Sequence, residues 1–170
     1  MEPDKTTDAI DEIIDDLHEH YPELDAVGLP VAGRILRLAR YLEARREDQL
    51  DDYDLTPADF DVLATLRRKA SQSAINVREL QHSLMLSSGG MTKRLDRLEV
   101  ADLLERRRDP DDRRGVLIAI TDAGRDLIDR VLPAVTNAES DLIAAAIPTA
   151  ERRAQVAAEL RHLLIAQEAD

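Results

Sequence analysis

Residues 103–120 read LLERRRDPDDRRGVLIAI. Residues 103–108 form a short strand candidate, and the β-branched run 116–120 is typical of a second strand. The polar segment between them contains Pro110 and Gly115, which favour a turn. The sequence therefore predicts one β-hairpin with a charged tip.

Two helical segments precede this hairpin. Asn76 and Glu79 form a helix start signal, with Glu79 placed to complete a capping box, and they open a short helix through Leu84. A turn at 86–90 leads into a second helix, 88–101, whose inward positions are Met91, Leu95 and Leu98. A short helix, a turn and a helix with an exposed basic side make a helix-turn-helix pattern, although many helical hairpins look similar.

Helices are also predicted on both sides of this region. Apolar residues recur at helical spacing in segments 10–21 and 31–49 and again in the segments that begin near 121 and 148. Thr56, Pro57 and Asp59 are suited to the start of a further helix that ends near Lys69, and Thr121 is suited to cap the helix that follows it. The expected fold is mainly α-helical with a small β wing.

The charge of the chain is unevenly distributed. The net charge is −12, yet residues 67–115 contain twelve Lys and Arg against eight Asp and Glu. A basic segment in an acidic chain is what a DNA-binding face on an acidic body would show. Charge alone is equally compatible with solvated helix faces that carry arginine.

Composition excludes several classes of protein. The chain has no cysteine, which excludes disulfides, thiolate catalysis and zinc–cysteine sites. No apolar run is long enough to cross a bilayer, and the acidic N-terminus lacks the basic start of a signal peptide. We therefore expect a cytoplasmic protein with no membrane partner.

The end of the hairpin carries a family resemblance. Asp112-x-Arg114, followed after five residues by Ile120-Thr121, resembles the wing signature D-x-R-x5-L-T of the MarR family of winged helix-turn-helix transcriptional regulators, with Ile in place of Leu. Segments 95–99 and 103–107 look like that family's recognition-helix end and first wing strand. Asp102 stands where the family usually has Gly, and we expect a left-handed, somewhat strained backbone there.

The resemblance implies a domain organisation and an activity. It implies a single domain, 1–170, in which helical regions 8–55 and 121–170 interlock with those of a second copy and residues 56–120 form the DNA-binding lobe. Apolar stripes on the terminal helices independently favour a homodimer. The expected function is that of a repressor on a pseudo-palindromic operator in double-stranded DNA, relieved by a small-molecule effector.

Candidate DNA-binding residues lie at two places. The helix that begins at Ser88 should enter the major groove, and the wing Arg of the family signature implies that Arg114 enters the minor groove and that Asp112 positions it. Gly89 and Gly90 suit close approach to phosphate or an ordinary turn, and Arg97 suits a phosphate contact or plain solvation. The full set is Ser87, Ser88, Gly89, Gly90, Thr92, Lys93, Arg97, Asp112, Arg113 and Arg114.

An effector site is suggested by the resemblance alone. Asp61, Arg94 and Arg106 are similar in position to residues implicated in the family's urate-responsive branch, which also has an extra N-terminal helix but carries a Trp that this chain lacks. The expected effector is a small anionic or aromatic molecule. The same three residues are also compatible with structural ion pairs.

Other functions find little support in the sequence. There is no phosphate loop, nucleophile motif or paired-histidine metal motif, so we expect no enzyme activity and no cofactor. His18 and His20 point apart on a helix, which is poor geometry for joint ligation of a metal. A winged helix that binds protein instead of DNA is disfavoured by the cationic hairpin, because such a partner needs no cationic tip.

Overall fold

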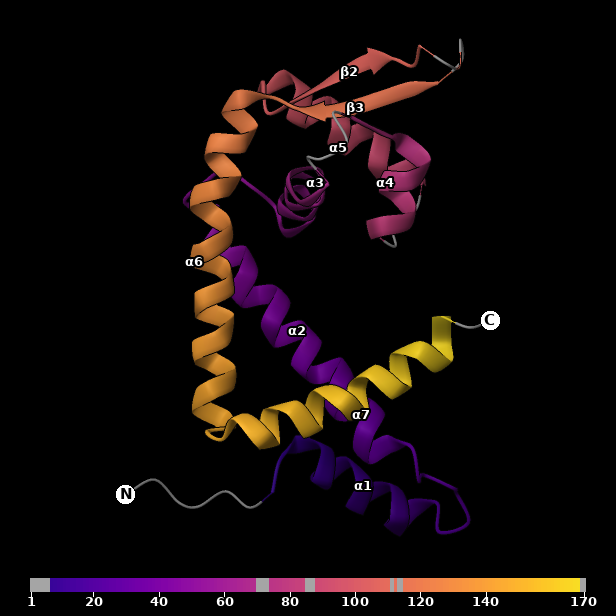
Figure 1. The fold of residues 1–170 in the computed structure, drawn as a ribbon. Coiled ribbons are helices and arrows are strands. Elements are labelled where there is room, and N and C mark those ends of the chain that lie inside the picture. Colours follow the sequence, from indigo (N-terminus) through magenta and orange to yellow (C-terminus); the bar gives the residue numbers. More distant parts are fainter. Residues whose placement is uncertain (1–6, 70–73, 85–87, 111, 113–114, 169–170) are drawn as a thin grey trace. The chain divides into compact units, whose positions relative to one another are not determined.

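The computed structural model describes residues 7–69, 74–84, 88–110, 112 and 115–168, and for residues 88 and 89 the backbone alone. Two compact units are present, Met1–Asp48 and Gln49–Asp170. The described elements are α1 (Ala9–His20), α2 (Leu29–Asp51), α3 (Pro57–Arg68), β1 (Ile75–Asn76), α4 (Val77–Leu84), α5 (Ser88–Val100), β2 (Leu104–Arg108), β3 (Val116–Ile120), α6 (Asp122–Ala146) and α7 (Ala150–Glu168) (Figure 1). Among the described residues, no helix is long and apolar enough to cross a membrane.

The predicted hairpin is the main part of a three-stranded antiparallel sheet with the order β1-β3-β2. Leu104 pairs with Ile120 and Arg108 with Val116, and the turn between the strands is closed by a hydrogen bond from the Gly115 N–H to the carbonyl of Asp112 (2.8 Å). Strand β1 is a finding that the sequence did not predict, because two residues show no alternation of polar and apolar side chains. Figure 1 shows the hairpin together with the helices of the same unit.

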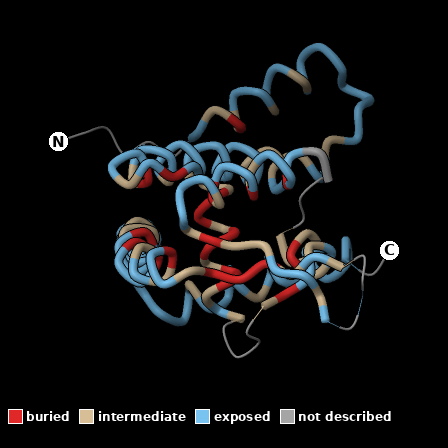
Figure 2. Tube along the Cα trace, turned by 90° about the horizontal axis from the view of Figure 1, so that it is seen from above, coloured by how far each residue is buried: buried red, intermediate tan, exposed pale blue. Residues whose placement is uncertain are grey.

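The core of the second unit is mainly aliphatic, with Phe60 as its buried aromatic side chain, and is built around the sheet. Its fully buried side chains come from the end of α2, from α3, α4 and α5, from the sheet and from the first half of α6, and they include Leu50, Leu63, Leu80, Met91, Leu95, Leu98, Ile118 and Ile128. Burying each such side chain contributes roughly 1.5–3 kcal/mol before the loss of conformational entropy is counted. In Figure 2 the buried stretches gather in this region, whereas α7 has no buried residue.

Three helix starts follow the predicted capping residues. The Thr56 side chain accepts a hydrogen bond from the Asp59 N–H, and Asp59 returns the bond to the Thr56 N–H, which completes a capping box. Thr121 caps α6 through the N–H of Gly124 (3.0 Å). Asn76 accepts from the Glu79 N–H at the start of α4 (2.8 Å), while the Glu79 carboxylate binds Lys69 of the neighbouring segment.

The turn after α5 has the left-handed backbone that the sequence predicts. Asp102 has φ of 58°, a conformation that favours glycine. It lets the chain reverse so that the Leu103 N–H donates to the carbonyl of Leu98 (2.9 Å), which closes the end of the helix. The hydroxyl of Thr121 donates to the Asp102 carbonyl (2.7 Å), so the end of β3 secures the same turn.

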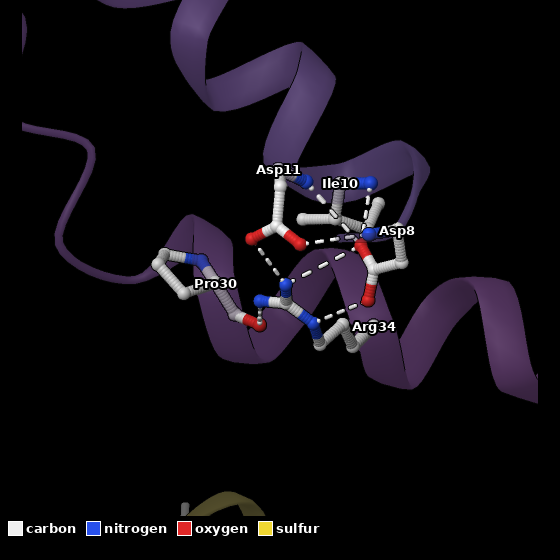
Figure 3. Close-up of polar contacts among 5 residues, drawn as sticks. All are labelled: Asp8, Ile10, Asp11, Pro30 and Arg34. Carbon is white, nitrogen blue, oxygen red and sulfur yellow. Dashed lines mark hydrogen bonds and ion pairs between the residues drawn. The ribbon is translucent and has the colours of Figure 1, made fainter. Parts of the chain in front are cut away.

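In the first unit, α1 is fastened to α2 through one arginine (Figure 3). Arg34 of α2 donates to the carboxylates of Asp8 (2.8 Å) and Asp11 (2.6 Å) and to the carbonyl of Pro30 (3.0 Å). Asp8 and Asp11 also form the capping box of α1. Ile10 lies beside Gly33, where an added Cβ would come within 3.2 Å of its side chain. The glycine thus leaves room for the only buried residue that α1 contributes among its described positions.

We expect Gly124→Ala to destabilise the second unit. A Cβ at this position would lie 2.0 Å from the carbonyl oxygen of Leu103, so the joint between β2 and α6 would have to open. The cost should be about 1–3 kcal/mol or more, seen as a lower thermal unfolding midpoint. Gly28→Ala is the matched control because nothing lies within 4 Å of its added Cβ. Equal midpoints for the two variants would contradict this account of the joint.

We also expect Arg34→Gln to loosen α1. The hydrogen bond from Arg34 lowers the pKa of Asp8 below its ordinary value of 3.8. The pKa of Asp11 is also lowered, mainly by the hydrogen bond from the Asp8 N–H and next by the hydrogen bond from Arg34. Because both pKa values are lowered on folding, the contact contributes its full stability above that value and loses it as the pH falls through the lowered pKa. At neutral pH, α1 amides should exchange about two- to fivefold faster in the variant than in the wild type.

A control variant and a pH series separate the effect of these ion pairs from an effect of packing. Arg40→Gln, at an exposed position of the same helix, should leave exchange in α1 unchanged. The difference between Arg34→Gln and wild type should vanish once the pH is well below 3.8, where the two carboxylates are protonated. A difference that persists in acid would show that Arg34 acts through packing and not through these ion pairs.

Candidate nucleic-acid interface

Helix α5 has one buried face and one exposed polar face. Met91, Leu95 and Leu98 are buried, and the residues Gly90, Thr92 and Lys93 are exposed. This separation follows from the helical repeat, which places positions three and four apart on one side. Ser88 and Gly89 belong to the first turn of α5, where the backbone alone is described. The face that the sequence assigned to DNA is therefore open to a ligand at its described positions.

Other expected DNA-binding residues belong to segments with less description. Ser87, Arg113 and Arg114 lie outside the described residues. Asp112 is exposed, and its carbonyl accepts the hydrogen bond that closes the wing turn. The described part of the wing thus supplies the hydrogen bond that closes the hairpin turn.

A buried carboxylate lies behind α5. Asp59, in the first turn of α3, has only 1% of its surface exposed. Its Oδ2 accepts from the hydroxyl of Thr56 (2.5 Å) and contacts the Arg97 guanidinium, whereas Oδ1 lies 3.7 Å from Nε of Arg94. Arg97 also donates to the Thr56 hydroxyl (3.2 Å). Arg97 therefore has an acidic partner within the chain. The sequence had suggested either a phosphate contact or plain solvation for this residue, and neither includes such a partner.

These residues line a small cavity. It has a volume of about 290 Å³ and is bordered by Thr56, Asp59, Gly90, Lys93, Arg94 and Arg97. Three cationic side chains face one carboxylate, so the lining carries a net positive charge. Within the described part of the chain, Nη1 of Arg94 is buried without a hydrogen-bond partner. The net positive charge of the lining can attract an anion.

Arg106 connects the wing to the other flank of α5. Its guanidinium binds Asp96 (2.6 Å) and Glu99, and its backbone N–H donates to the Glu99 carboxylate (3.1 Å). Partial burial opposes the charged form, but the hydrogen bonds to Asp96 and Glu99 outweigh this effect and raise the pKa of Arg106. Arg106 therefore stays charged and links β2 to α5 through these ion pairs.

The three expected effector residues have different surroundings. Asp61 lines a hollow of about 690 Å³ that also includes Arg67, Ser83 and Asp129. Arg94 lines the smaller cavity beside Asp59, and Arg106 is engaged by Asp96 and Glu99. The observed pairs of Arg94 and Arg106 agree with the alternative of structural ion pairs. In the described ranges, no group of three or more His, Cys, Asp or Glu is arranged to hold a metal ion.

Sequence reasoning missed the second role of Asp59. An acidic residue three positions after Thr56 is fully explained by helix capping, so its long-range contacts left no separate signal. The one signal in the sequence is the spacing of Arg94 and Arg97, which lie three residues apart on α5 and can therefore share a partner. The location of that partner depends on the packing of α3 against α5, which no local pattern contains.

Comparison with known proteins gives a consistent result. The sequence profile of the MarR family matches residues 55–116. The chain is 35% identical over 123 residues to the HTH-type transcriptional regulator PecS of Dickeya dadantii, which covers 72% of this chain and 74% of PecS. It is 32% identical over 98 residues to the multiple antibiotic resistance protein MarR of Escherichia coli K12, which covers 55% of this chain and 66% of MarR.

A solved structure extends the match over nearly the whole chain. A cysteine-to-serine mutant of E. coli MarR, complexed with operator DNA, aligns with a TM-score of 0.72 and 25% identity over 93% of this chain and 99% of that one. PecS is named as a regulator of transcription, not as an enzyme. With the hairpin and the two-faced α5, these matches show that the chain belongs to the MarR family of winged helix-turn-helix, DNA-binding regulators of transcription.

Proposed function

We propose that this protein binds a pseudo-palindromic operator in double-stranded DNA as a homodimer and acts as a repressor. The observation that carries the proposal is the exposed face of α5, with Thr92 and Lys93 in solvent opposite a fully buried apolar face. A helix of this kind fits the major groove, where hydrogen bonds to base edges specify the sequence. The likeness to a MarR structure that is complexed with operator DNA supports the binding of operator DNA by this chain.

Individual contacts follow from this placement. Thr92 and Lys93 would contact base edges or phosphates, and the backbone of residues 87–90 would approach a phosphate at the start of α5. On the wing, Arg114 would enter the minor groove, with Asp112 and Arg113 beside it. Residues 56–120 would form the DNA-binding lobe of each subunit, and action on DNA would place the protein in the cytoplasm.

The terminal helices support the dimer. Helix α7 exposes 46–54% of each of the side chains Leu160, Leu163, Leu164 and Ile165. Large exposed apolar side chains gathered on one helix favour an interaction surface. A second copy of the chain is the proposed partner, with residues 8–55 and 121–170 forming the dimerisation region. Two-fold symmetry of the protein would then require a two-fold operator.

An effector completes the proposal. The resemblance to the family supports relief of repression by a small anionic or aromatic molecule. Arg94 and Asp61 each line a cavity in the described structure, and the cavity of Arg94 also contains Lys93 and Arg97. Arg106 is occupied by Asp96 and Glu99, so it would contribute only after those ion pairs open.

DNA binding can be tested on a duplex from the promoter region of the protein's own gene. Wild-type affinity should fall steeply as salt rises, because bound phosphates release their counterions when lysine and arginine neutralise them. Lys93→Gln should weaken binding and reduce the slope of log K against log salt by about one. Lys69→Gln is the matched control, since the Lys69 ammonium is already paired with Glu79. Binding without salt dependence would contradict the proposal.

The dimer can be tested on α7. Leu160→Glu combined with Leu164→Glu places two charges in the exposed apolar group and should convert the dimer to monomer in analytical ultracentrifugation. Gln155→Glu combined with Gln167→Glu adds the same charge at exposed polar positions of α7 and should leave the dimer intact. A wild-type chain that sediments as a folded monomer at micromolar concentration would refute the dimer.

A further inference from the structure

We propose that Asp59 is a positioning residue for DNA recognition. From the first turn of α3, its buried carboxylate holds Arg94 and Arg97 of α5 and so fixes the rotation of the α5 face that meets DNA. The inference rests on the DNA binding proposed above. Asp59 itself does not touch DNA in this account, because only 1% of it is exposed.

The geometry gives one carboxylate two partners on the same helix. Oδ2 contacts Arg97 and Oδ1 faces Arg94 at 3.7 Å, and these arginines are separated by about one turn of α5. The carboxylate is itself fixed to the backbone of α3 through its hydrogen bond from the Thr56 N–H (3.0 Å). A rigid acceptor that holds two points along a helix resists both sliding and rotation of that helix.

Helix capping does not account for the charge of Asp59. The capping box needs one oxygen that accepts from the Thr56 N–H, and a neutral amide oxygen can supply it. A fully charged carboxylate is costly to bury unless cations compensate it. Two arginines from α5 provide that compensation. The negative charge therefore serves the contact between α3 and α5.

The second flank of α5 is held in the same way. At 100° per residue, Arg94 and Arg97 fall on one side of the buried face and Asp96 and Glu99 on the other. Arg106 of β2 binds the latter pair. Ion pairs on both flanks thus hold α5 over its apolar contacts, with Lys93 next to the flank that Asp59 controls.

Charge and positioning predict opposite results for Asp59→Asn. This change keeps the size of the side chain and an oxygen for the capping box, and removes one negative charge close to the DNA-binding face. If charge alone mattered, the variant would bind every duplex more tightly. If Asp59 positions α5, the variant will lose the preference for the correct base sequence, while its affinity for unrelated DNA stays the same or rises.

The experiment compares two dissociation constants for each protein at one salt concentration. The probes are a duplex that the wild type selects from a random-sequence pool and poly(dI-dC). We expect Asp59→Asn to reduce the ratio of the two affinities about tenfold, the size of a poorly read base pair. Glu105→Gln is the control, because it removes the same charge from an exposed ion pair with Arg107 in the same lobe and should keep the ratio.

Folding is checked by the thermal midpoint and by circular dichroism at the assay temperature. If Asp59→Asn does not fold, Arg97→Met carries the test, because Arg97 is half exposed and its removal still leaves Arg94 beside the buried Asp59 carboxylate. A lost preference with retained affinity for poly(dI-dC) supports positioning in either variant. Tighter binding to both duplexes with an unchanged ratio would overturn the inference. Wild-type protein that selects no sequence would instead refute the proposed function itself.

Discussion

Helix α5 must bury one face in the core and expose the opposite face to solvent, and the rest of the lobe depends on how both faces are held in place. It buries Met91, Leu95 and Leu98 in the core and leaves Thr92 and Lys93 in solvent. Apolar packing is non-directional and tolerates rotation, so it cannot by itself fix which polar side chains point outward. Directional ion pairs, from Asp59 on one flank and Arg106 on the other, supply that definition. The lobe therefore combines an aliphatic core for stability with charged contacts for orientation.

The same division between core and surface explains the acidic chain with a basic segment. The arginines of residues 67–115 are not a uniform cationic surface, because several of them are engaged by neighbouring acids: Arg67 by Asp129, Arg106 by Asp96 and Glu99, and Arg107 by Glu105. Exposed pairs of this kind contribute little to stability. They do reduce the positive charge on the surface of the lobe and so weaken its general electrostatic attraction to DNA. Individual contacts, such as one from Lys93, then make up a larger share of the binding free energy.

Much of this fold follows from local sequence signals, and the exceptions have physical reasons. The hairpin, the capping residues Thr56 and Thr121 and the left-handed Asp102 were predicted because each depends on a few neighbouring residues. Strand β1 was missed because its pairing partner, β3, is about forty residues away in the sequence. The candidate face of α5 was predicted from helical spacing, but the contacts of Asp59 and Arg106 depend on tertiary packing and were beyond any local pattern.

The joint between the wing and α6 has a mechanical consequence. Thr121 donates to the carbonyls of Asp102 and Leu103, Arg125 donates to the carbonyl of Ile120 (2.9 Å), and Gly124 leaves no space between α6 and Leu103. The end of α5, the base of the wing and the start of α6 are thus locked at one point. Because these contacts join α6 to both elements, a tilt of α6 would turn α5 and the base of the wing together and would reorient them without deforming either one.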